Sequence, residues 1–343
     1  MDKIYNRFNP MKALIYADRI EQIVDGQIPN PVVWHIYPTN RCQLNCWYCI
    51  MKGEQEKHKD AILSDEAMWK IPADAVEHDI KMVQFVGGGE PLMHPETIMV
   101  AIALRVNMIR TALSTNGVLM HEPHLILQAF DYIRISLDAG NAKSYQKRKG
   151  VDLFDTVMCN VKNLVAIKKA KQWKNDIALG FVITPENYEE IYEFCWLAMK
   201  AKVDFVHIRP AYLENDALLM RLMPEIIKLS EQAKRDFGDH LDIYTIKDKF
   251  DGYWTPRTYD KCRSTPLIAV MTATGEFIPC LDVFSPRWGN YNKQRFAEAW
   301  FSQEHKEAIA SLDLDNCPRC VNTKINEIIQ NCFIYDDIRK VIL

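Results

Sequence analysis

Three cysteines lie within eight positions near the start of the chain, at Cys42, Cys46 and Cys49, with the spacing C-x3-C-x2-C. Three thiolates can ligate three irons of a [4Fe–4S] cluster and leave the fourth iron open to another ligand. The alternative is a zinc site that takes a fourth ligand such as His58, since structural zinc is held by four protein ligands. The spacing therefore predicts a metal centre, and an iron–sulfur cluster here has one open coordination position.

Four more cysteines lie in the C-terminal part of the chain, and their spacing indicates a second metal site. They are Cys262, Cys280, Cys317 and Cys320, and the last two form a C-x2-C pair. Such a pair beside a hairpin is usual in zinc sites, and four thiolates can also ligate every iron of a [4Fe–4S] cluster. Because these four can complete a site of their own, they are poor candidates for the missing ligand of the first.

The composition is that of a globular cytoplasmic protein. The chain has 343 residues, of which 48% are hydrophobic and 25% charged, and its formal net charge is −3. No apolar run reaches the ~18 residues needed to cross a membrane, and the N-terminus lacks the apolar core of a signal peptide. Cytosolic thiols are kept reduced, so the ten cysteines predict metal or redox chemistry instead of a disulfide framework. The charge gives no indication of a nucleic-acid-binding surface.

Short apolar runs alternate with longer amphipathic segments, a pattern that indicates strands and helices around a parallel sheet. The runs span residues 32–37, 82–87, 111–116, 132–138, 177–184 and 204–209. We therefore predict an α/β fold, a partial TIM-like (β/α)6 barrel over residues 32–248, with a possible edge strand at 241–246. A helical lead-in is expected over residues 1–31.

The pattern changes after about residue 248, and we predict a domain boundary there. Residues 249–343 begin with a polar and aromatic stretch that is broken by proline and glycine. LIAVMTATGEFIPC follows, and it indicates two short strands around a glycine-containing turn. We expect a small domain made of this β-hairpin and a C-terminal helix, tied together by its cysteines.

Strand alternation separates polar from apolar side chains on two of the runs. Arg134, Ser136 and Asp138 share one face of the fourth run, and His207 and Arg209 share one face of the sixth. The intervening residues are apolar: Ile133, Ile135, Leu137, Val206 and Ile208. Because the apolar face must pack on helices, the polar side chains are expected to point into the barrel and line a cavity.

The first cysteine segment, with Tyr48 directly before its third cysteine, resembles the signature of radical S-adenosylmethionine (radical SAM) enzymes. VGGGEP at 86–91 resembles the GGEP motif of the same superfamily. The resemblance covers roughly residues 32–210. It implies a [4Fe–4S] cluster on the three cysteines and S-adenosylmethionine (AdoMet) on the open iron. It further implies reductive cleavage of AdoMet to methionine and a 5′-deoxyadenosyl radical, which abstracts hydrogen from a substrate.

The same resemblance implies which residues contact AdoMet in the turn after the second strand. Glycines let backbone approach a ligand closely, so Gly88 and Gly89 are expected to meet the methionine amine. Glu90 and Pro91 shape this turn, and Tyr48 belongs to the same cofactor site.

Polar residues at later strand ends are further candidates by resemblance. Asn116 and Ser136 are candidates for the AdoMet ribose or carboxylate. Arg148 resembles a family arginine that pairs with the carboxylate, a charge-assisted contact; the alternative is that it belongs to a solvated basic run. The inward His207 and Arg209 are catalytic-site candidates that contact an anionic or hydroxylated group of the substrate.

The second cysteine set resembles the auxiliary-cluster domain called SPASM and its shorter relative, twitch. The shared pattern is C-x12-G-x4-C from Cys262 to Cys280, followed by the C-x2-C pair. The chain has too few cysteines for the full SPASM pattern, whereas the four-cysteine twitch version fits. This implies a second, fully ligated [4Fe–4S] cluster with a role in electron transfer.

Three cysteines remain outside both sets. Cys159 and Cys195 lie in apolar helical segments, where we expect buried structural thiols. Cys332 lies close in sequence to the C-x2-C pair. It is a candidate for a cluster ligand or for a hydrogen donor to a substrate radical.

The resemblance favours a radical SAM oxidoreductase or isomerase that oxidises or epimerises a small polar molecule, sugar-like or aminocyclitol-like, with the auxiliary cluster as electron acceptor. Peptide modification is an alternative, although the 31 residues before the first strand are expected to be too few for a leader-recognition domain. A zinc-containing structural or binding protein is the alternative of another class. The implied partners are the substrate and a reductant such as flavodoxin or ferredoxin, without a membrane or, as the charge suggests, a nucleic acid.

Overall fold

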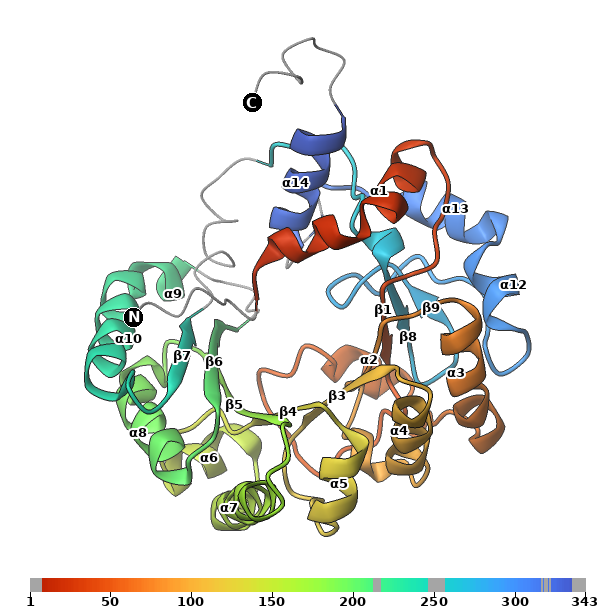
Figure 1. Cartoon of the computed structure of the whole chain (residues 1–343). Coiled ribbons are helices and arrows are strands. Elements are labelled where there is room, and N and C mark those ends of the chain that lie inside the picture. The colour runs from red at the N-terminus through yellow and green to blue at the C-terminus, as the bar shows by residue number, and fades with distance from the viewer. Residues whose placement is uncertain are drawn as a thin grey trace.

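The fold is an open, curved sheet with helices on its convex side, as the computed structural model in Figure 1 shows. The structure describes residues 8–211, 217–245, 257–315, 317, 320 and 322–334. The predicted domain boundary near residue 248 lies outside the described residues.

One nine-stranded sheet, in the order β7-β6-β5-β4-β3-β2-β1-β8-β9, organises the described part of the chain. The strands are β1 (Val33–Ile36), β2 (Met82–Phe85), β3 (Arg110–Thr115), β4 (Tyr132–Ser136), β5 (Asp176–Ile183), β6 (Phe205–Pro210), β7 (Asp242–Thr245), β8 (Ile268–Met271) and β9 (Phe277–Ile278). Strands β1 to β7 are parallel neighbours, so the six predicted strands and the edge strand β7 are confirmed. The sheet does not close, which confirms a partial TIM-like barrel.

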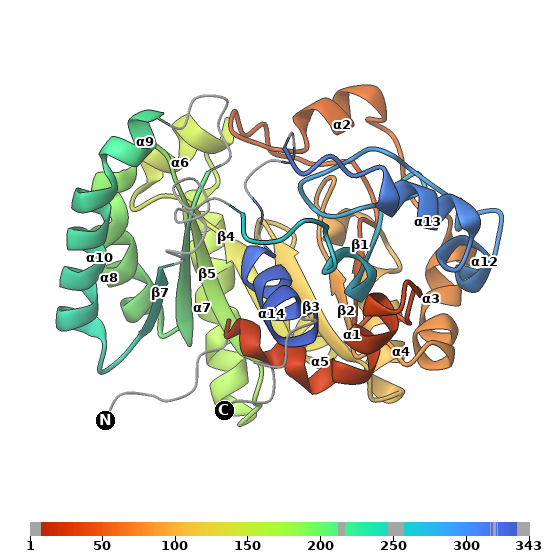
Figure 2. The same cartoon turned by 90° about the horizontal axis from the view of Figure 1, so that it is seen from above.

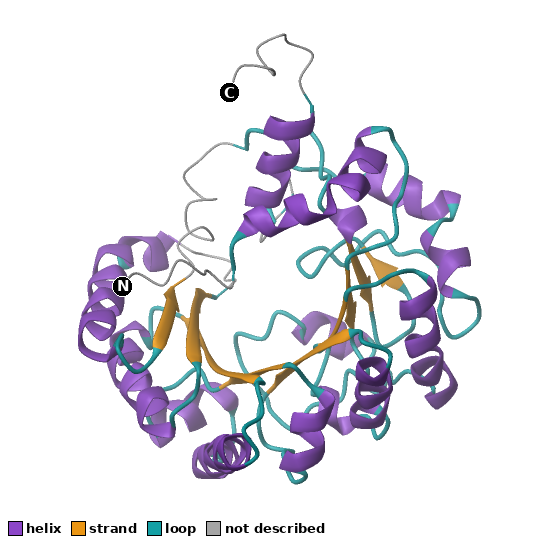
Figure 3. Cartoon of the chain, viewed as in Figure 1, coloured by secondary structure: helices purple, strands orange, loops and turns teal. Residues whose placement is uncertain are grey.

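Helices connect the strands or flank them in sequence, and most of them lie on the convex side of the curved sheet (Figure 3). They are η1 (Pro10–Tyr16), α1 (Ala17–Val24), α2 (Lys52–Lys57), α3 (Asp65–Glu77), η2 (Pro91–Met93), α4 (Thr97–Val106), α5 (Pro123–Ala129), α6 (Ala142–Lys149), α7 (Phe154–Ala170), η3 (Tyr188–Glu190), α8 (Ile191–Ala201), α9 (Ala217–Arg221), α10 (Met223–Phe237), η4 (Thr265–Leu267), α12 (Phe296–Trp300), α13 (Gln303–Ala310) and α14 (Thr323–Phe333). Within the described ranges, no helix combines the length and apolar character that a membrane span requires.

The main core lies between the sheet and these helices. Ile133, Ile135 and Leu137 are fully buried in it, as are Val206 and Ile208. The residues between them therefore lie on the opposite, concave face of the sheet, which we call the inner face. This confirms the predicted alternation on β4 and β6.

The helical lead-in and the last helix lie across the open side of the curved sheet (Figures 1 and 2). Helix α14 packs against both η1 and α1. Ile20 of α1, Leu267 of η4 and Ile329 of α14 are buried together in a small apolar cluster. The lead-in predicted from residue 1 is confirmed from residue 10 to residue 24.

The C-terminal hairpin is built onto the sheet instead of standing apart from it. Strand β8 pairs in parallel with β1, from Val33 opposite Ile268 onward, and β9 pairs antiparallel with β8. Trp34 of β1 is fully buried, and its ring centroid lies 6.4 Å from that of Phe277 and 4.6 Å from that of Phe296. The predicted hairpin is confirmed, and its first strand extends the barrel sheet.

His305 of α13 makes folding sensitive to acid. Its Nδ1 lies 2.5 Å from the carbonyl oxygen of Trp300, and its ring stacks on Trp288 at 4.3 Å. Burial lowers the pKa of His305 from 6.5 to about 4. As the pH falls through this window, the unfolded chain binds a proton that the folded chain does not, so the stability that neutral His305 contributes is complete above pH 6.5 and is lost toward pH 4.

We therefore expect His305→Phe to reduce the loss of unfolding free energy between about pH 7.5 and pH 5 by about 2 kcal/mol. Urea unfolding at both pH values measures this difference. The exposed His121, changed to Gln, serves as the control. An identical pH dependence in wild type and His305→Phe would show that His305 does not carry the effect.

Candidate functional site

The three cysteines of C-x3-C-x2-C lie on the loop that leaves the carboxyl end of β1, and all three are partly buried. The loop is fastened to the end of α6, because the Asn45 amide donates to the Lys149 carbonyl at 2.9 Å. Burial raises the pKa of each thiol, that of Cys42 to about 11. A bound cation reverses such a shift, since a metal-coordinated thiol loses its proton. The set therefore has the chemistry of metal ligands.

The glycine turn after β2 packs directly on the backbone of this loop. A Cβ at Gly88 would lie 1.8 Å from Oδ1 of Asn40, and one at Gly89 would lie 2.0 Å from the carbonyl oxygen of Arg41. The Gly89 amide donates to the carbonyl of Thr39 at 2.8 Å. Only glycine permits this approach, so the GGGEP motif sets how closely the two loops meet.

Glu90 joins the glycine turn to the end of β3. Its buried carboxylate accepts hydrogen bonds from Thr115 Oγ1 at 2.7 Å and from the Asn116 amide at 2.8 Å. Burial raises the pKa of Glu90 to about 7, although these bonds oppose the shift. The side-chain amide of Asn116 lies 3.8 Å from Cys42 Sγ and accepts a hydrogen bond from Gln43 at 3.1 Å. Glu90 therefore holds Asn116 against the cysteine loop.

Pro91 is the first residue of η2 and is buried. Helix α2, which follows the loop, also touches the turn, because Gln55 Nε2 donates to the Gly88 carbonyl at 2.5 Å. Asn40 Oδ1 and Gln43 Oε1 are buried in the described structure without hydrogen-bond partners. The site thus offers polar atoms and glycine backbone beside three thiols, a donor set that suits an iron–sulfur cluster and AdoMet.

A buried ion pair supports the loop from the other side. Asp138, just after β4, forms an ion pair with Lys149 of α6 and accepts a hydrogen bond from the Tyr48 hydroxyl at 2.8 Å. The Val182 amide donates to the other carboxylate oxygen at 2.7 Å. Burial opposes ionisation of Asp138, but the charge of Lys149 outweighs it and holds the pKa below its usual range. Tyr48 is thereby fixed one residue before the third cysteine.

Arg148 is buried beside this pair. Its guanidinium donates to Thr184 Oγ1 at 2.8 Å and to the Val182 carbonyl at 3.2 Å, and it lies 4.7 Å from the centre of the Tyr48 ring. Its Nε has no partner among the described residues. Arg148 therefore does not belong to a solvated run, and an AdoMet contact for it stays a prediction.

Ser136, His207 and Arg209 share the inner face near the ends of their strands. Ser136 is paired with Gly180 of β5, which in turn is paired with His207 of β6. The His207 ring is buried and stacks on Phe8 at 4.6 Å. The structure therefore brings the polar residues predicted on β4 and β6 to one surface.

Two cysteines of the second set, Cys262 and Cys280, flank the β8–β9 hairpin in sequence, and Cys317 and Cys320 follow α13. Cys262, Cys280, Cys317 and Cys320 are all partly buried. Burial raises the pKa of Cys280 to about 12, and Asp282, Cys262 and Cys317 add to the shift. Burial likewise raises the pKa of Cys317 to about 11, with contributions from Cys320 and Cys262. Each of these two thiols is therefore influenced by other cysteines of the set, and a single site formed by all four stays a prediction.

An apolar cluster connects the two cysteine sets. It contains buried Tyr37 and Met51, with Cys49 of the first loop and Leu281, next to Cys280, packed against it. The buried members are Tyr37, Met51, Val86, Val270, Ala273 and Ile278. An ion pair reinforces this connection, because Arg287 bridges Glu54 of α2 at 2.5 Å and Glu276 of the hairpin at 3.1 Å.

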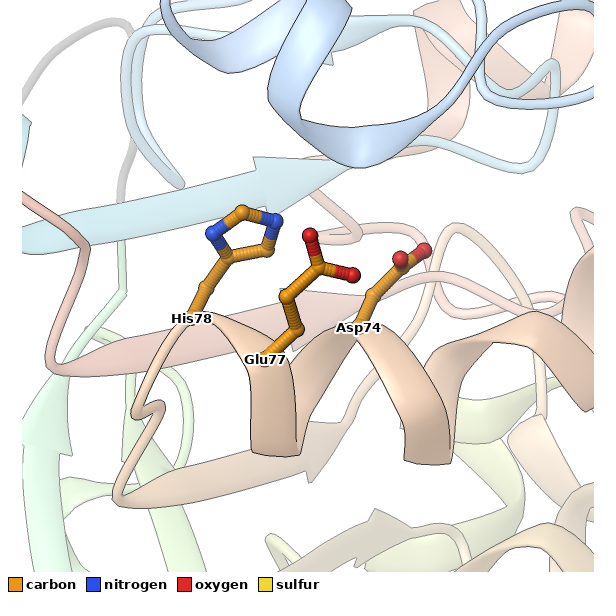
Figure 4. Close-up of side chains that lie close together, drawn as sticks. All are labelled: Asp74, Glu77 and His78. Atoms are coloured by element: carbon orange, nitrogen blue, oxygen red, sulfur yellow. The ribbon is translucent and has the colours of Figure 1, made fainter.

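Asp74, Glu77 and His78 form a further group of possible ligands near the end of α3, and their side chains point toward the C-terminal segment (Figure 4). Asp74 accepts a hydrogen bond from the Tyr291 hydroxyl at 2.5 Å, and the His78 ring lies 5.0 Å from the Phe296 ring. These contacts join α3 to the C-terminal segment, so a structural role explains why the three side chains lie close together.

Among the described residues, no three cysteine sulfurs lie within 4.8 Å of one another. Zinc held by four protein ligands stays the alternative that metal analysis must exclude.

The remaining cysteines correct one prediction. Cys195 is buried, as predicted, but the prediction of a buried Cys159 is wrong, because Cys159 is exposed. Helix α7 buries the stripe formed by Phe154, Val157, Met158, Val161 and Leu164, and position 159 lies off that stripe. Cys332 is exposed on the last turn of α14.

Sequence reasoning missed Lys149, Gln43 and Glu54. Lys149 stands in the basic run KRK, a pattern that is typical of a solvated helix face. The one local signal was Gly150, which ends α6 in the left-handed conformation and so marks Lys149 as the last residue of that helix. Neither Gln43 nor Glu54 belongs to a recognisable sequence motif, and the hydrogen-bond partner of Gln43 and the ion-pair partner of Glu54 are distant in sequence.

Comparisons with known proteins match this architecture. A sequence model of the radical SAM superfamily matches residues 36–195. The chain is 29% identical over 173 residues to a protein of Saccharolobus islandicus named "Probable GTP 3′,8-cyclase", covering 50% of this chain and 54% of that protein. A protein of the same name from Sulfurisphaera tokodaii is 25% identical over 173 residues, covering 50% and 53%. The chain thus spans about half the length of the curated relatives it matches.

Solved structures share the fold. Streptococcus suis SuiB bound to S-adenosylmethionine has a TM-score of 0.65 at 19% identity, covering 90% of this chain and 75% of that chain. The structure of anSMEcpe with bound AdoMet has a TM-score of 0.61 at 15% identity, covering 87% and 85%. At these identities the similarity concerns the fold alone.

Proposed function

Because the chain belongs to the radical SAM superfamily through residues 36–195, we propose that it is an enzyme that binds a [4Fe–4S] cluster through Cys42, Cys46 and Cys49 and cleaves AdoMet reductively. The observation that carries the proposal is the fastening of the three-thiol loop against the glycine turn at the carboxyl end of β1. Reactive groups gather at this end of the strands in α/β barrels.

A [4Fe–4S] cluster held by Cys42, Cys46 and Cys49 would supply the electron for AdoMet cleavage, and the residues around the loop would position the reactants. Glu90 fixes Asn116 beside Cys42, and the ion pair of Asp138 with Lys149 fixes Tyr48. Asn116, Ser136 and Arg148 remain our candidates for contacts to the ribose and carboxylate of AdoMet, and Gly88 and Gly89 for the methionine amine.

We further propose a second [4Fe–4S] cluster on Cys262, Cys280, Cys317 and Cys320. This proposal is supported by the apolar cluster and the ion pair of Arg287 with Glu54, which connect the hairpin to the first loop and to α2, so that electrons could pass through packed protein. The reaction proposed is oxidation or epimerisation of a small polar molecule, with the second cluster as electron acceptor. The name of the curated relatives adds a guanine nucleotide to the substrates to be tested.

Anaerobic purification tests the metal content. We expect a brown protein with about eight irons per chain that absorbs near ~400 nm. After reduction with dithionite, added AdoMet should yield 5′-deoxyadenosine and methionine. A colourless, zinc-containing protein that leaves AdoMet intact would refute the proposal.

Deuterated substrates test the reaction class. Sugars, aminocyclitols, GTP and peptides are each supplied with reduced enzyme and AdoMet, and mass spectrometry follows deuterium into 5′-deoxyadenosine. Transfer from a sugar or aminocyclitol supports the proposal. Transfer from a peptide alone would replace the small-molecule proposal with peptide modification.

A further inference from the structure

Arg134 projects from β4 over the inner face of the sheet. A Cβ at Gly180 of β5 would lie 3.7 Å from Cγ and Cδ of Arg134, so the side chain runs across this glycine. Arg134 Nη2 donates to Ser114 Oγ at 3.0 Å, and the same oxygen accepts a hydrogen bond from Gln84 at 3.2 Å. The glycine and the serine together hold the guanidinium in the concave space of the sheet.

The positive charge of Arg134 interacts with ionisable residues on both sides of β4 in the curved sheet, Arg209 on β6 and His35 on β1. Burial lowers the pKa of Arg134 to about 10, and the positive charge of Arg209 on β6 adds to the shift. On β1, burial lowers the pKa of His35 to about 4, and Arg134 contributes there as well. Only β5 lies between β4 and β6 in the sheet, and the register and alternation place Arg134 and Arg209 on the same inner face, so the two positive charges share one concave surface.

This pair of arginines has no anionic partner of its own. Among the described residues, no carboxylate lies within ion-pair distance of Arg134 or Arg209. Asp138 raises the pKa of Arg134 only as a minor influence, and that carboxylate is already bound by Lys149 and Tyr48. Two like charges on a partly buried surface are costly, and an anion placed between them removes that cost.

We propose that Arg134 and Arg209 bind an anionic group of the substrate, a phosphate or a carboxylate, and this inference rests on the proposed function. Guanidinium groups suit both, because their planar N–H groups match two oxygens of one anion. Ser114 of β3, which holds Arg134, lies two residues before Asn116, which directly follows the strand, and two extended residues span roughly 7 Å. The anionic group is thus seated one layer of side chains below the cysteine loop, and the uncharged part of the substrate faces that loop.

Anion binding to the iron-loaded, AdoMet-bound protein tests the proposal. Inorganic phosphate and acetate are titrated separately by calorimetry, and the anion that binds more tightly identifies the group. We expect Arg134→Gln and Arg209→Gln each to weaken binding about tenfold or more, because each removes a charged hydrogen-bond donor. Arg209→Lys should recover part of the affinity, since it restores the charge.

Arg110→Gln is the matched control. Arg110 is exposed at the start of β3 and pairs with Asp131, so its loss should leave anion binding unchanged. Iron content is measured for every variant, so that only loaded protein is compared. The proposal is overturned if wild type binds neither anion, if both glutamine variants bind as wild type does, or if Arg110→Gln weakens binding equally. AdoMet cleavage is scored separately, so a chain that binds the anion without cleaving AdoMet refutes the proposed function and not the anion site.

Discussion

Cys46→Ala is expected to abolish AdoMet cleavage while the protein keeps about half of its iron. Two thiolates cannot hold the cluster that three hold, and the loop carries no further cysteine that could replace Cys46. Iron analysis and the yield of 5′-deoxyadenosine measure the two effects in the same preparation. About four irons per chain should remain, and 5′-deoxyadenosine should fall to the background of the reaction without enzyme.

Cys280→Ala is the counterpart at the second site. It should remove iron there and spare the cluster on the first loop, so that AdoMet is still cleaved while substrate turnover falls. Loss of all iron from Cys46→Ala would mean that the two sites do not load independently. Full AdoMet cleavage by Cys46→Ala would exclude the first loop as the cluster site.

Lys149→Met should destabilise the protein by about 3–5 kcal/mol, because it leaves Asp138 buried as an uncompensated charge. Both side chains of this pair are at most 3% exposed, so water cannot replace the lost ammonium. Since Asp138 also fixes Tyr48, we expect the cysteine loop to loosen and the iron at the first site to fall. Urea unfolding and iron analysis measure both effects.

Lys147→Met is the control for that experiment. Lys147 stands two residues earlier on α6, and its ion pair with Glu186 is exposed, so its loss should cost less than about 1 kcal/mol. The double change Asp138→Asn with Lys149→Met should recover part of the lost stability, because it removes the unpaired charge. A Lys149→Met protein as stable as Lys147→Met would contradict the role given to the buried pair.

The sequence predicted those parts of the fold that follow from local pattern. Alternation on β4 placed Arg134 and Ser136 opposite Ile133 and Ile135, because a strand can present only two faces. The cysteine and glycine motifs pointed to strand ends that the structure brings into contact. Each of these predictions depended on residues that are close in sequence.

Other features could not be predicted because their causes are distant in sequence. Nothing in the apolar run at 268–271 indicates that this strand pairs with β1, so the sequence alone predicts a separate domain. Lys149 has the same local surroundings as the exposed Lys147, and only Asp138 and Tyr48 distinguish the two. The wrong prediction for Cys159 has a local cause. A largely apolar helix still has an exposed side, and its composition alone does not reveal which residues lie on that side.

The pairing of β8 with β1 also constrains the order in which the protein matures. Strand β1 leaves the ribosome more than two hundred residues before the strand that covers its edge, so that edge stays open during most of synthesis. Contacts of such large sequence separation form slowly, because a long loop must close first. The cysteine loop at the end of β1 therefore reaches its final support late, and assembly of the first cluster is expected to follow completion of the whole chain instead of that of its N-terminal half.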